Sequence, residues 1–435
     1  MVKMNSMLKH QTLFKRWLNT LDSKRNQTAV IDLTTDTEWT ISEIEKLLAQ
    51  KPSLTSSIIA RLGGIELIVN TIWAWRDQVP LILLDENVLF KTEQLEGIPE
   101  GVAHIKHTSG TTGAPKFVLF SDKQIQADAD QINSSMGLQK YDCNIGVISP
   151  VHSYGFSNLI LPLLLYGIPL IICDSPLPEN LRIALRKAKG SIILPAVPAM
   201  WNAWERAGVL KDTPVKLAIS AGAPLTIDLE QRIYDSSGIK VHNFYGSSEC
   251  GGITYDASKA VRKSSHITGT PISGVELEVT PIGRLIVKSA ATAISYWPDN
   301  RNEELGSGRY LTGDLAEIDT LSNQLLLIGR MSEEINIAGR KVSPVDVEKA
   351  MMSIAQIEYC VVFGIPSYQS DRVEDIVACY RSLENINEAA LHEELKKKLP
   401  SWQLPRRYWG RSDLRMNKLG KISRSDWRER YLSAH

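Results

Sequence analysis

The sequence has few cysteines, no net charge and no long apolar run. Its five cysteines are widely spaced and include no Cys-x-x-Cys pair, which argues against a zinc ribbon or a redox dithiol and predicts reduced thiols. Lysine plus arginine and aspartate plus glutamate each number 49, so there is no charge excess to attract nucleic acid or an acidic membrane. A small-molecule partner is therefore the simpler prediction.

The lack of a long apolar run bears on membranes and secretion. The most apolar stretch, Leu159–Cys173, is short for a bilayer and contains prolines and a glycine, so we expect it to be buried core. Charged residues interrupt Met1–Gln27, which therefore lacks the apolar run of a signal peptide. We predict a cytoplasmic protein without a membrane span.

What is present is an apolar content typical of folded domains. Hydrophobic residues make up 43% of the chain, and 435 residues exceed what one core usually organises, so several packed units are expected. Short strand-like runs at Leu81–Leu84, Gly146–Ser149, Leu170–Cys173 and Ser191–Leu194 alternate with longer helical patterns. This alternation predicts a mostly parallel α/β body.

The pattern changes near Gly329. A strand is predicted at Leu325–Ile328, a polar stretch follows, and Ser343 is expected to be the N-cap of a helix within a mixed α+β tail. We therefore predict an α/β protein with a large multi-subdomain N-terminal body at 1–330 and a smaller mobile α+β C-terminal domain at 331–435.

A glycine-rich segment, His107–Lys116, carries four hydroxyl side chains, two glycines and a lysine in ten residues. Glycine lets backbone N–H groups approach phosphate oxygens, hydroxyls donate further hydrogen bonds, and lysine supplies a mobile cation. An ordinary Ser/Thr/Gly turn is the alternative. The residues predicted to contact a polyphosphate are Thr108, Ser109, Gly110, Thr111, Thr112, Gly113 and Lys116.

The segment differs from a P-loop in sequence and in context. The spacing Gly-x-x-x-x-Gly-Lys-Ser/Thr is not met, and Lys116 leads into the apolar run Phe117–Phe120 rather than into a helix. Helical periodicity begins only after Ser121, an N-cap with Gln124 three residues later. The segment is therefore predicted to join two strands.

With the motifs that follow it, this segment resembles the signatures of the acyl-adenylate-forming superfamily, which comprises acyl-CoA and aryl-CoA ligases, peptide-synthetase adenylation domains and luciferases. The motifs occur in the family's order from about His104 onward, and the part before residue 104 is shorter than usual. The resemblance implies ATP and Mg²⁺ as cofactors, with coenzyme A or a phosphopantetheine as co-substrate.

Two motifs resemble the family's adenine and metal site. The turn Gly222, Ala223 and Pro224 resembles its adenine-side turn, and Asn243–Glu249 resembles the Tyr-Gly-x-Thr-Glu signature with serine in place of threonine. The resemblance implies that Tyr245 stacks on adenine, Ser248 contacts the α-phosphate and Glu249 holds Mg²⁺, a hard cation that prefers oxygen ligands. Further residues implied in this site are Asn243 and Gly246 for the nucleotide and Thr111 for the metal and catalysis.

Later motifs supply the ribose contacts and a catalytic lysine. Asp314 in Tyr-Leu-Thr-Gly-Asp resembles the ribose-binding aspartate, and Arg330 resembles the arginine that also reaches the ribose. Lys421 resembles the lysine of Gly-Lys-x-x-Arg, which enters the active site for adenylation and stabilises the charge on the leaving pyrophosphate. Taken singly, these motifs also fit strand-end turns or a solvated basic face.

The hinge and the thiol passage have family counterparts too. Ser332 stands at the hinge position, which is usually Asp or Lys, and Asn336 stands where Lys is frequent. Gly339 matches the glycine that lets a pantetheine arm pass.

The acyl pocket is expected near Pro150–Phe156, which resembles the family's His-containing signature. Amino-acid-activating relatives place an Asp there to pair with the α-ammonium, and none is present, so we predict an aryl or aliphatic acid. A core histidine is the alternative for His152. The residues predicted to line the substrate site are His152, Ser153, Phe156, Gly251, Gly252 and Gly339.

The predicted function is ATP-dependent activation of a carboxylic acid as acyl-AMP, followed by transfer to the thiol of coenzyme A or of a carrier protein. A stand-alone adenylating enzyme with a non-thiol acceptor is one alternative. A non-catalytic nucleotide- or acyl-binding module is the other, and the presence of Glu249, Asp314 and Lys421 argues against it.

Overall fold

The computed structural model describes residues 12–61, 63–84, 90, 97–108, 116–298, 304–330, 335–337, 340–367, 374–384, 386–416 and 422–435. The chain divides into two compact units. The first comprises Met1–Glu278, Ile286–Thr312 and Ile318–Leu326, and the second comprises Val279–Leu285, Gly313–Glu317 and Leu327–His435.

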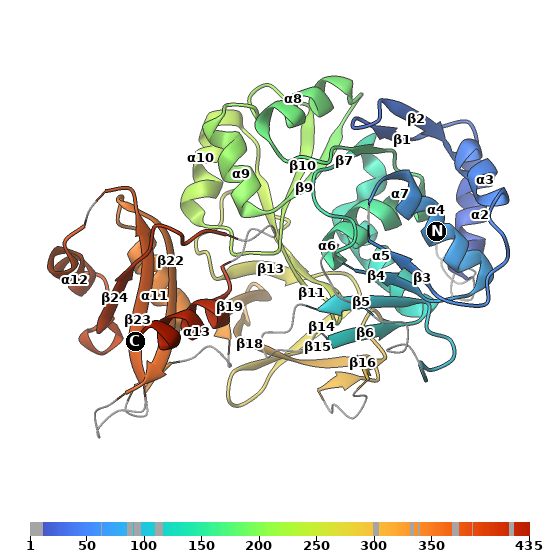
Figure 1. Ribbon diagram of the computed structural model, residues 1–435. Coiled ribbons are helices and arrows are strands. Elements are labelled where there is room, and N and C mark those ends of the chain that lie inside the picture. The colour runs from blue at the N-terminus through green and yellow to red at the C-terminus, as the bar shows by residue number, and fades with distance from the viewer. Residues whose placement is uncertain are drawn as a thin grey trace. The chain divides into compact units, whose positions relative to one another are not determined.

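Six parallel strands in the order β1-β8-β7-β9-β10-β11 form the centre of the first unit (Figure 1). Every residue of β9 is buried, as expected where both faces of a parallel sheet are covered. Antiparallel strands extend the sheet at both ends. The bounds are β1 (Thr28–Asp32), β2 (Thr37–Thr40), β7 (Cys143–Gly146), β8 (Leu170–Ile172), β9 (Ile192–Ala196), β10 (Val215–Ser220), β11 (Val241–Ser247), β12 (Gly251–Tyr255) and β13 (Ile267–Pro271).

Helices surround this sheet (Figure 1), and apolar residues of these helices are buried in the core. Helices α8, α9 and α10 lie together beside β9 and β10, whereas α2, α3 and α4 lie near β1 and β2. The apolar stretch Leu159–Cys173 is mostly buried, which confirms its prediction as core. The bounds are α2 (Leu13–Lys24), α3 (Ile41–Ala49), α4 (Gly64–Asp77), α5 (Asp122–Met136), η3 (Leu138–Lys140), α6 (Ser153–Gly155), η4 (Phe156–Ile160), α7 (Leu161–Tyr166), α8 (Pro178–Lys187), α9 (Pro198–Arg206) and α10 (Ile227–Ser237).

A second sheet in this unit has the order β16-β6-β5-β4-β3. Its members are β3 (Ile58–Ala60), β4 (Leu81–Leu83), β5 (His104–Thr108), β6 (Lys116–Phe120) and β16 (Ser295–Trp297). β5 and β6 pair antiparallel from His104↔Phe120 to Thr108↔Lys116, which confirms that the glycine-rich segment joins two strands. The prediction that a helix begins after Ser121 is also confirmed, because α5 starts at Asp122 and Gln124 Oε1 accepts a hydrogen bond from Ser121 N at 2.6 Å.

The strands predicted at Leu81–Leu84, Leu170–Cys173 and Ser191–Leu194 are confirmed within a residue or two, and the one predicted at Gly146–Ser149 is wrong. That strand, β7, ends at Gly146. The apolar residues after it are buried in the connection to α6. Buried Asn144 belongs to the strand because its backbone pairs with β8 and β9, and its side-chain Nδ2 donates to Asn158 O at 2.6 Å.

The second unit contains the three-stranded sheet β22-β23-β24. Side chains alternate across it: Val362 and Ile376 pack in one apolar cluster with α11 and α12, whereas Val361 and Val377 pack in another with α13. The helix predicted after Ser343 is confirmed as α11. The bounds are β20 (Ile335–Ile337), β21 (Arg340–Val342), α11 (Pro344–Met352), β22 (Ile357–Pro366), β23 (Glu374–Ser382), α12 (Glu388–Lys396), η6 (Ser401–Gln403), β24 (Arg407–Gly410) and α13 (Arg424–Ala434).

The remaining strands are β14 (Val275–Val279), β15 (Arg284–Ser289), β17 (Leu305–Gly306), β18 (Arg309–Asp319) and β19 (Gln324–Arg330). Within the described ranges, no helix combines the length and the apolar character needed to cross a bilayer.

Candidate active site

Several predicted site residues lie at the carboxyl edge of the parallel sheet. β10 ends two residues before Gly222, and β11 carries Asn243, Tyr245 and Gly246. Because these strands are parallel, their carboxyl ends meet at one edge, where open α/β sheets bind ligands. The sheet topology thus brings together motifs that are about twenty residues apart in the sequence.

The turn after β10 presents backbone rather than side chains. Gly222 has a φ of +83°, which a residue with a side chain adopts only under strain. Ala221 N donates to Ala196 O at 3.2 Å, which ties the turn to the end of β9. Ala223 is partly exposed and Pro224 is exposed. A flat ring could therefore lie against this turn without meeting a large side chain.

Tyr154 fixes the helix that follows β7 to the same edge. Its hydroxyl lies 3.2 Å from Ile219 O and 3.4 Å from Ala196 O, and its ring centroid is 6.2 Å from that of Phe244. Burial raises the pKa of Tyr154, so its hydroxyl remains a donor at neutral pH. The segment with His152 and Ser153 is thereby held beside β9, β10 and β11.

The turn between β11 and β12 holds Ser248 and Glu249. Ser247 Oγ accepts from the backbone N–H groups of Glu249 at 3.2 Å and Cys250 at 3.3 Å, which stabilises the turn. Ser248 and Glu249 are partly exposed, whereas Asn243 is buried and its Nδ2 donates to Thr268 O at 3.4 Å. The serine of the signature is thus accessible, whereas the asparagine holds the strand.

Two tyrosines position the Glu249 carboxylate. Tyr296 Oη in β16 donates to Glu249 Oε1 at 3.0 Å, and Tyr310 hydrogen-bonds to the Tyr296 hydroxyl. Burial, followed by the negative charge of Glu249, raises the pKa of both phenols, so both stay protonated and can donate. The backbone carbonyl of Glu249 also accepts a hydrogen bond from Ala293 N at 2.8 Å, which ties the backbone of Glu249 to the residues just before β16.

This arrangement fits a magnesium ion that is shared with phosphates. No group of three His, Cys, Asp or Glu side chains suited to a metal occurs among the residues that the structure describes. Mg²⁺ usually retains several waters and is bound through one or two carboxylates together with substrate phosphates. A single oriented carboxylate such as Glu249 matches that mode.

The glycine-rich segment itself falls mostly outside the described residues. Ser109, Gly110, Thr111, Thr112 and Gly113 belong to the part that is not described, and only the backbone of Thr108 and Lys116 is described. These two residues are paired at the ends of β5 and β6. The predicted phosphate-binding segment is therefore framed by a regular antiparallel pair.

The predicted acyl side is a helical segment with a π-helical turn. His152 is the N-cap residue of α6, Ser153 begins the helix, and Phe156 starts η4. His152 and Ser153 are partly exposed, so both could contact a ligand. Phe156 is fully buried and stacks on His104 with ring centroids 4.5 Å apart. It therefore packs in the core beneath the surface residues of this segment.

A buried polar group lies behind the two glycines predicted to line the substrate site. Asp128 Oδ1 accepts from Gly252 N at 3.0 Å, and Asp128 Oδ2 accepts from Ser157 Oγ. Gly251 has a φ of +69°, and a Cβ there would lie 2.1 Å from Asp128 Oδ1. Asp128 thus fills the space that a side chain at this position would require.

Two basic residues of β5 share this region. His104 and Lys106 are both buried, and both contact the Phe120 ring, His104 at 6.4 Å between ring centroids and Lys106 Nζ at 4.5 Å. They therefore lie on the same face of the strand. We call His104, Lys106, Asp128 and Ser157 the Lys106 cluster. Burial lowers the pKa of Lys106, and Asp128 exerts the largest opposing influence.

The remaining predicted residues belong to the second unit. Asp314 is buried within β18, and Arg330 ends β19 with only its backbone described. Ser332, Gly339 and Lys421 lie outside the described residues, and Asn336 is described only in its backbone. The ribose and lysine assignments therefore remain predictions from the sequence.

Sequence reasoning missed the tyrosine beside Glu249 and the Lys106 cluster. Asp128 offered a signal, because it follows Ile125 by three residues and so lies on the apolar face of a predicted helix. Lys106 and His104 offered another, since two basic residues alternate in a strand that precedes a phosphate-binding segment. Tyr296 gave no local signal.

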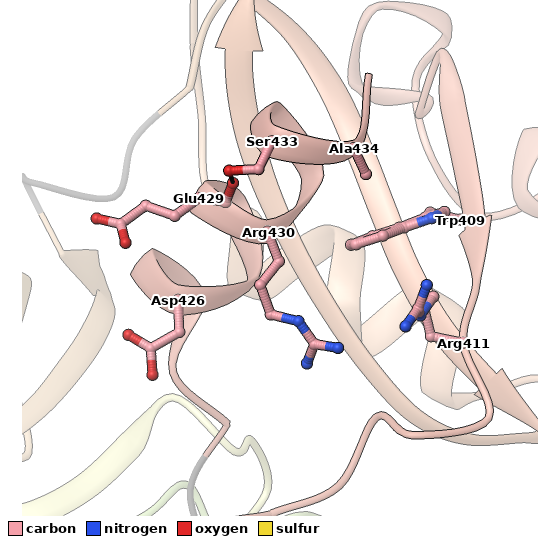
Figure 2. A pocket seen from close by; sticks show the side chains of 7 residues that line it. All are labelled: Trp409, Arg411, Asp426, Glu429, Arg430, Ser433 and Ala434. Carbon is pink, nitrogen blue, oxygen red and sulfur yellow. Dashed lines mark hydrogen bonds between the residues drawn. The ribbon is translucent and has the colours of Figure 1, made fainter.

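A surface hollow of about 490 Å³ lies between β24 and α13 of the second unit. Figure 2 shows Arg430 of α13 and Arg411 extending into it beside Trp409. Both guanidinium groups are paired with Asp413. None of the predicted site residues lines it.

Comparison with known proteins gives consistent findings. The family described as AMP-binding enzyme matches residues 19–297. The 2-succinylbenzoate–CoA ligase of Enterococcus faecalis is 24% identical over 363 residues, covering 80% of this chain and 73% of that enzyme. The 4-hydroxybenzoate–CoA/benzoate–CoA ligase of Rhodopseudomonas palustris is 26% identical over 371 residues, covering 78% of this chain and 68% of that enzyme.

Solved structures share the fold. ATP-bound MatB from Rhodopseudomonas palustris superposes with a TM-score of 0.84 at 19% identity, covering 97% of this chain and 98% of that chain. The o-succinylbenzoate CoA synthetase (MenE) of Bacillus subtilis, in complex with its acyl-adenylate intermediate, superposes with a TM-score of 0.84 at 17% identity, covering 96% and 98%. The predicted fold class, a large α/β body with a smaller C-terminal domain, is confirmed.

Proposed function

The chain belongs to the AMP-binding enzyme family, and from this premise we propose that it is an AMP-forming acid–thiol ligase that activates a carboxylic acid with ATP and transfers the acyl group to coenzyme A. The observation that carries the proposal is the family match over residues 19–297, which contain the oriented Glu249 carboxylate at the carboxyl edge of the sheet. ATP, Mg²⁺ and coenzyme A are its cofactors and co-substrate.

We propose the following roles in the first half-reaction. The Gly222–Pro224 turn and Tyr245 hold the adenine, the segment from Thr108 to Lys116 holds the phosphates, and Ser248 contacts the α-phosphate. Glu249, oriented by Tyr296, would hold Mg²⁺, which neutralises phosphate charge when bound. Asp314 and Arg330 hold the ribose. Binding both reactants at one edge removes much of the entropic barrier to attack by the carboxylate oxygen on the α-phosphorus.

Lys421 is proposed to stabilise the transition state. Negative charge moves to the departing pyrophosphate while the acid oxygen bonds to phosphorus, so a cation placed near both groups binds the transition state more tightly than the ground state. Lysine does this without a covalent intermediate. We propose that residues 331–435 form the mobile domain that carries it.

In the second half-reaction the thiol attacks the acyl carbonyl, and AMP leaves with the bonding electrons of the acyl–oxygen bond. Gly339 is proposed to leave space for the pantetheine arm of coenzyme A. A carrier-protein phosphopantetheine is the second acceptor that this chemistry permits, because it presents the same thiol. A cytoplasmic location fits the five free cysteines.

The acid is proposed to be aryl or aliphatic and to lack an α-ammonium. His152 and Ser153 are accessible at the carboxyl edge. Gly251 and Gly252 keep the backbone beside Glu249 free of side chains, because Asp128, Ile272 and Phe244 fill the space that a Cβ would need. The relatives named above act on aromatic acids, which supports testing aromatic acids first.

Acid-dependent exchange of pyrophosphate into ATP, without any thiol, tests the proposal. Wild-type protein should catalyse exchange with at least one acid among benzoates, hydroxycinnamates and fatty acids. Glu249→Gln and Lys421→Ala should each reduce exchange by about 10²- to 10³-fold, the usual effect of removing one charge-stabilising group. Wild-type-level exchange in either variant would overturn that residue's role.

A further inference from the structure

The Lys106 cluster contains polar groups that the fold leaves without partners. Lys106 is 3% exposed and His104 is 1% exposed. Among the described residues, neither ring nitrogen of His104 has a hydrogen-bond partner. No hydrogen bond or ion pair of Lys106 Nζ is found there either, and this ammonium lies over the Phe120 ring, 4.5 Å from the centroid. Buried polar groups that lack partners are costly to the fold, so their presence calls for an explanation outside the fold.

The nearest carboxylate does not supply the missing partner. Asp128 already accepts hydrogen bonds from Gly252 N and Ser157 Oγ, and it forms no ion pair with Lys106. Its charge offsets that of the ammonium at a distance, which keeps a cation tolerable in a buried place. Within the described ranges, the three N–H donors of the ammonium therefore remain available to a ligand.

The location of the cluster relates it to the acid. On one side, His104 stacks on Phe156, which belongs to the helical segment of the acyl side. On the other side, Asp128 accepts a hydrogen bond from Gly252 N and fills the space beside Gly251, which is two residues after Glu249 in the chain. The unpartnered donors thus lie between two elements that are proposed to surround the acyl group.

We propose that Lys106, assisted by His104, forms a subsite for a second oxygen function of the acid, a hydroxyl, keto or carboxylate oxygen remote from the carboxylate that is activated. This inference rests on the proposed function and narrows its substrate class. The ammonium donates to the acceptor oxygen, and neutral His104 can donate or accept according to its tautomer. A plain hydrocarbon acid leaves these donors unpaired and is selected against.

Replacing Lys106 should change the selectivity for the acid more than the stability of the fold. In Lys106→Met a thioether chain of similar length replaces a buried cation, and Asp128 keeps its hydrogen bonds from Gly252 N and Ser157 Oγ, so the fold should lose little stability. The same change removes the donor that recognises oxygen. A residue whose role is purely structural would show the opposite pattern.

The test uses exchange of pyrophosphate into ATP with benzoate, 4-hydroxybenzoate and benzene-1,4-dicarboxylate, and with hexanoate and adipate as an aliphatic pair. Wild-type protein should favour the oxygen-bearing member of at least one pair by about 10- to 100-fold in kcat/KM, the range for a hydrogen bond to a charged group. Lys106→Met should abolish the preference while it retains exchange with the plain acid. A comparison of 4-hydroxybenzoate with benzene-1,4-dicarboxylate shows whether the subsite prefers a neutral oxygen acceptor or an anionic one.

A surface control and a binding measurement make every outcome decisive. Lys123→Met, at an exposed lysine of α5, should leave the preference unchanged. Calorimetric titration of the same acids into both proteins measures the subsite without catalysis. Equal loss of exchange with all acids in Lys106→Met, or equal affinities in the two proteins, would overturn the subsite. If exchange is absent but Lys106-dependent affinity for the oxygen-bearing acid remains, the proposed function fails and the subsite stands.

Discussion

Two groups of buried charges in the first unit are satisfied to different extents. In the first group, which we call the Glu230 network, Glu230 accepts from Lys240 at 2.5 Å and from Arg262 at 2.8 Å, and Asp256 accepts from Lys240 at 2.6 Å. Arg262 also donates to backbone carbonyls, so every charge there has a partner within the protein. In the Lys106 cluster no hydrogen bond or ion pair to the cation is found among the described residues, and its contact is with the Phe120 ring.

The difference indicates what each group is for. A fully bonded set of buried charges specifies how its elements pack, because breaking one contact leaves another charge unpaired. The Glu230 network joins α10, β11 and the segment before β13 in this way. Lys106 contacts the Phe120 ring but has no carboxylate partner among the described residues, and the proposed ligand subsite accounts for its retention. The number of hydrogen-bond and ion-pair partners of a buried charged group therefore distinguishes groups that stabilise the fold from groups proposed to bind a ligand.

The largest expected effect is on the Glu230 network. Glu230→Gln leaves Lys240 and Arg262 buried with one carboxylate fewer, so the free energy of unfolding should fall by about 3–5 kcal/mol. Urea unfolding with tryptophan fluorescence measures the change. Asp228→Asn is the control, because Asp228 pairs with Arg232 at the surface and should cost less than about 1 kcal/mol. Equal losses in both variants would remove the distinction between scaffold and surface pairs.

The second-largest expected effect is on Mg²⁺ binding by Glu249. Tyr296→Phe removes the hydroxyl that donates to Glu249 while it keeps the ring, so the Mg²⁺ concentration for half-maximal exchange should rise by roughly 10-fold, the lower end for lost outer-shell partners. Saturating Mg²⁺ should restore most of the rate. Tyr310→Phe, one hydrogen bond further away, should produce a smaller shift. A lower rate with an unchanged Mg²⁺ requirement would show that Tyr296 acts on packing.

The smallest effect is a pH dependence from His104. Burial lowers its pKa well below 6.5, so the folded protein holds a neutral ring while the unfolded chain takes up a proton near pH 6.5. Stability is therefore lost as the pH falls below about 6.5, by up to about 1.4 kcal/mol per pH unit until the folded pKa is reached. His104→Phe should flatten this slope between pH 6.5 and pH 5.5 in urea unfolding. Parallel slopes in both proteins would assign the dependence to other groups.

Local signals predicted much of the fold. The helix after Ser121 and the strand after Lys116 follow from a capping pair and an apolar run, and both were found where the sequence placed them. The strand predicted at Gly146–Ser149 was placed too late in the chain, because apolar composition alone cannot distinguish the buried strand β7 from the buried loop that follows it. Boundaries inside a continuous apolar run depend on hydrogen bonding rather than on residue type.

The site was predictable only where a motif is contiguous. Glu249 lies in a continuous signature, whereas its partner Tyr296 is 47 residues away and reaches it because β16 pairs with β6. Pairing between distant strands depends on the whole sheet and leaves no trace in a window of sequence. The role of Lys106 was hidden for a similar reason, since the absence of a partner is a property of the packed structure.

The same pairing has a consequence for synthesis on the ribosome. β6 is an apolar strand whose outer edge is covered by β16, which is translated ~175 residues later, on the order of ten to thirty seconds at typical elongation rates. During that interval the emerging chain carries an open, aggregation-prone edge beside the predicted phosphate-binding segment. Completion of this sheet, and with it the seating of Glu249, is thus a late event that a nascent chain reaches only after most of the first unit has left the exit tunnel.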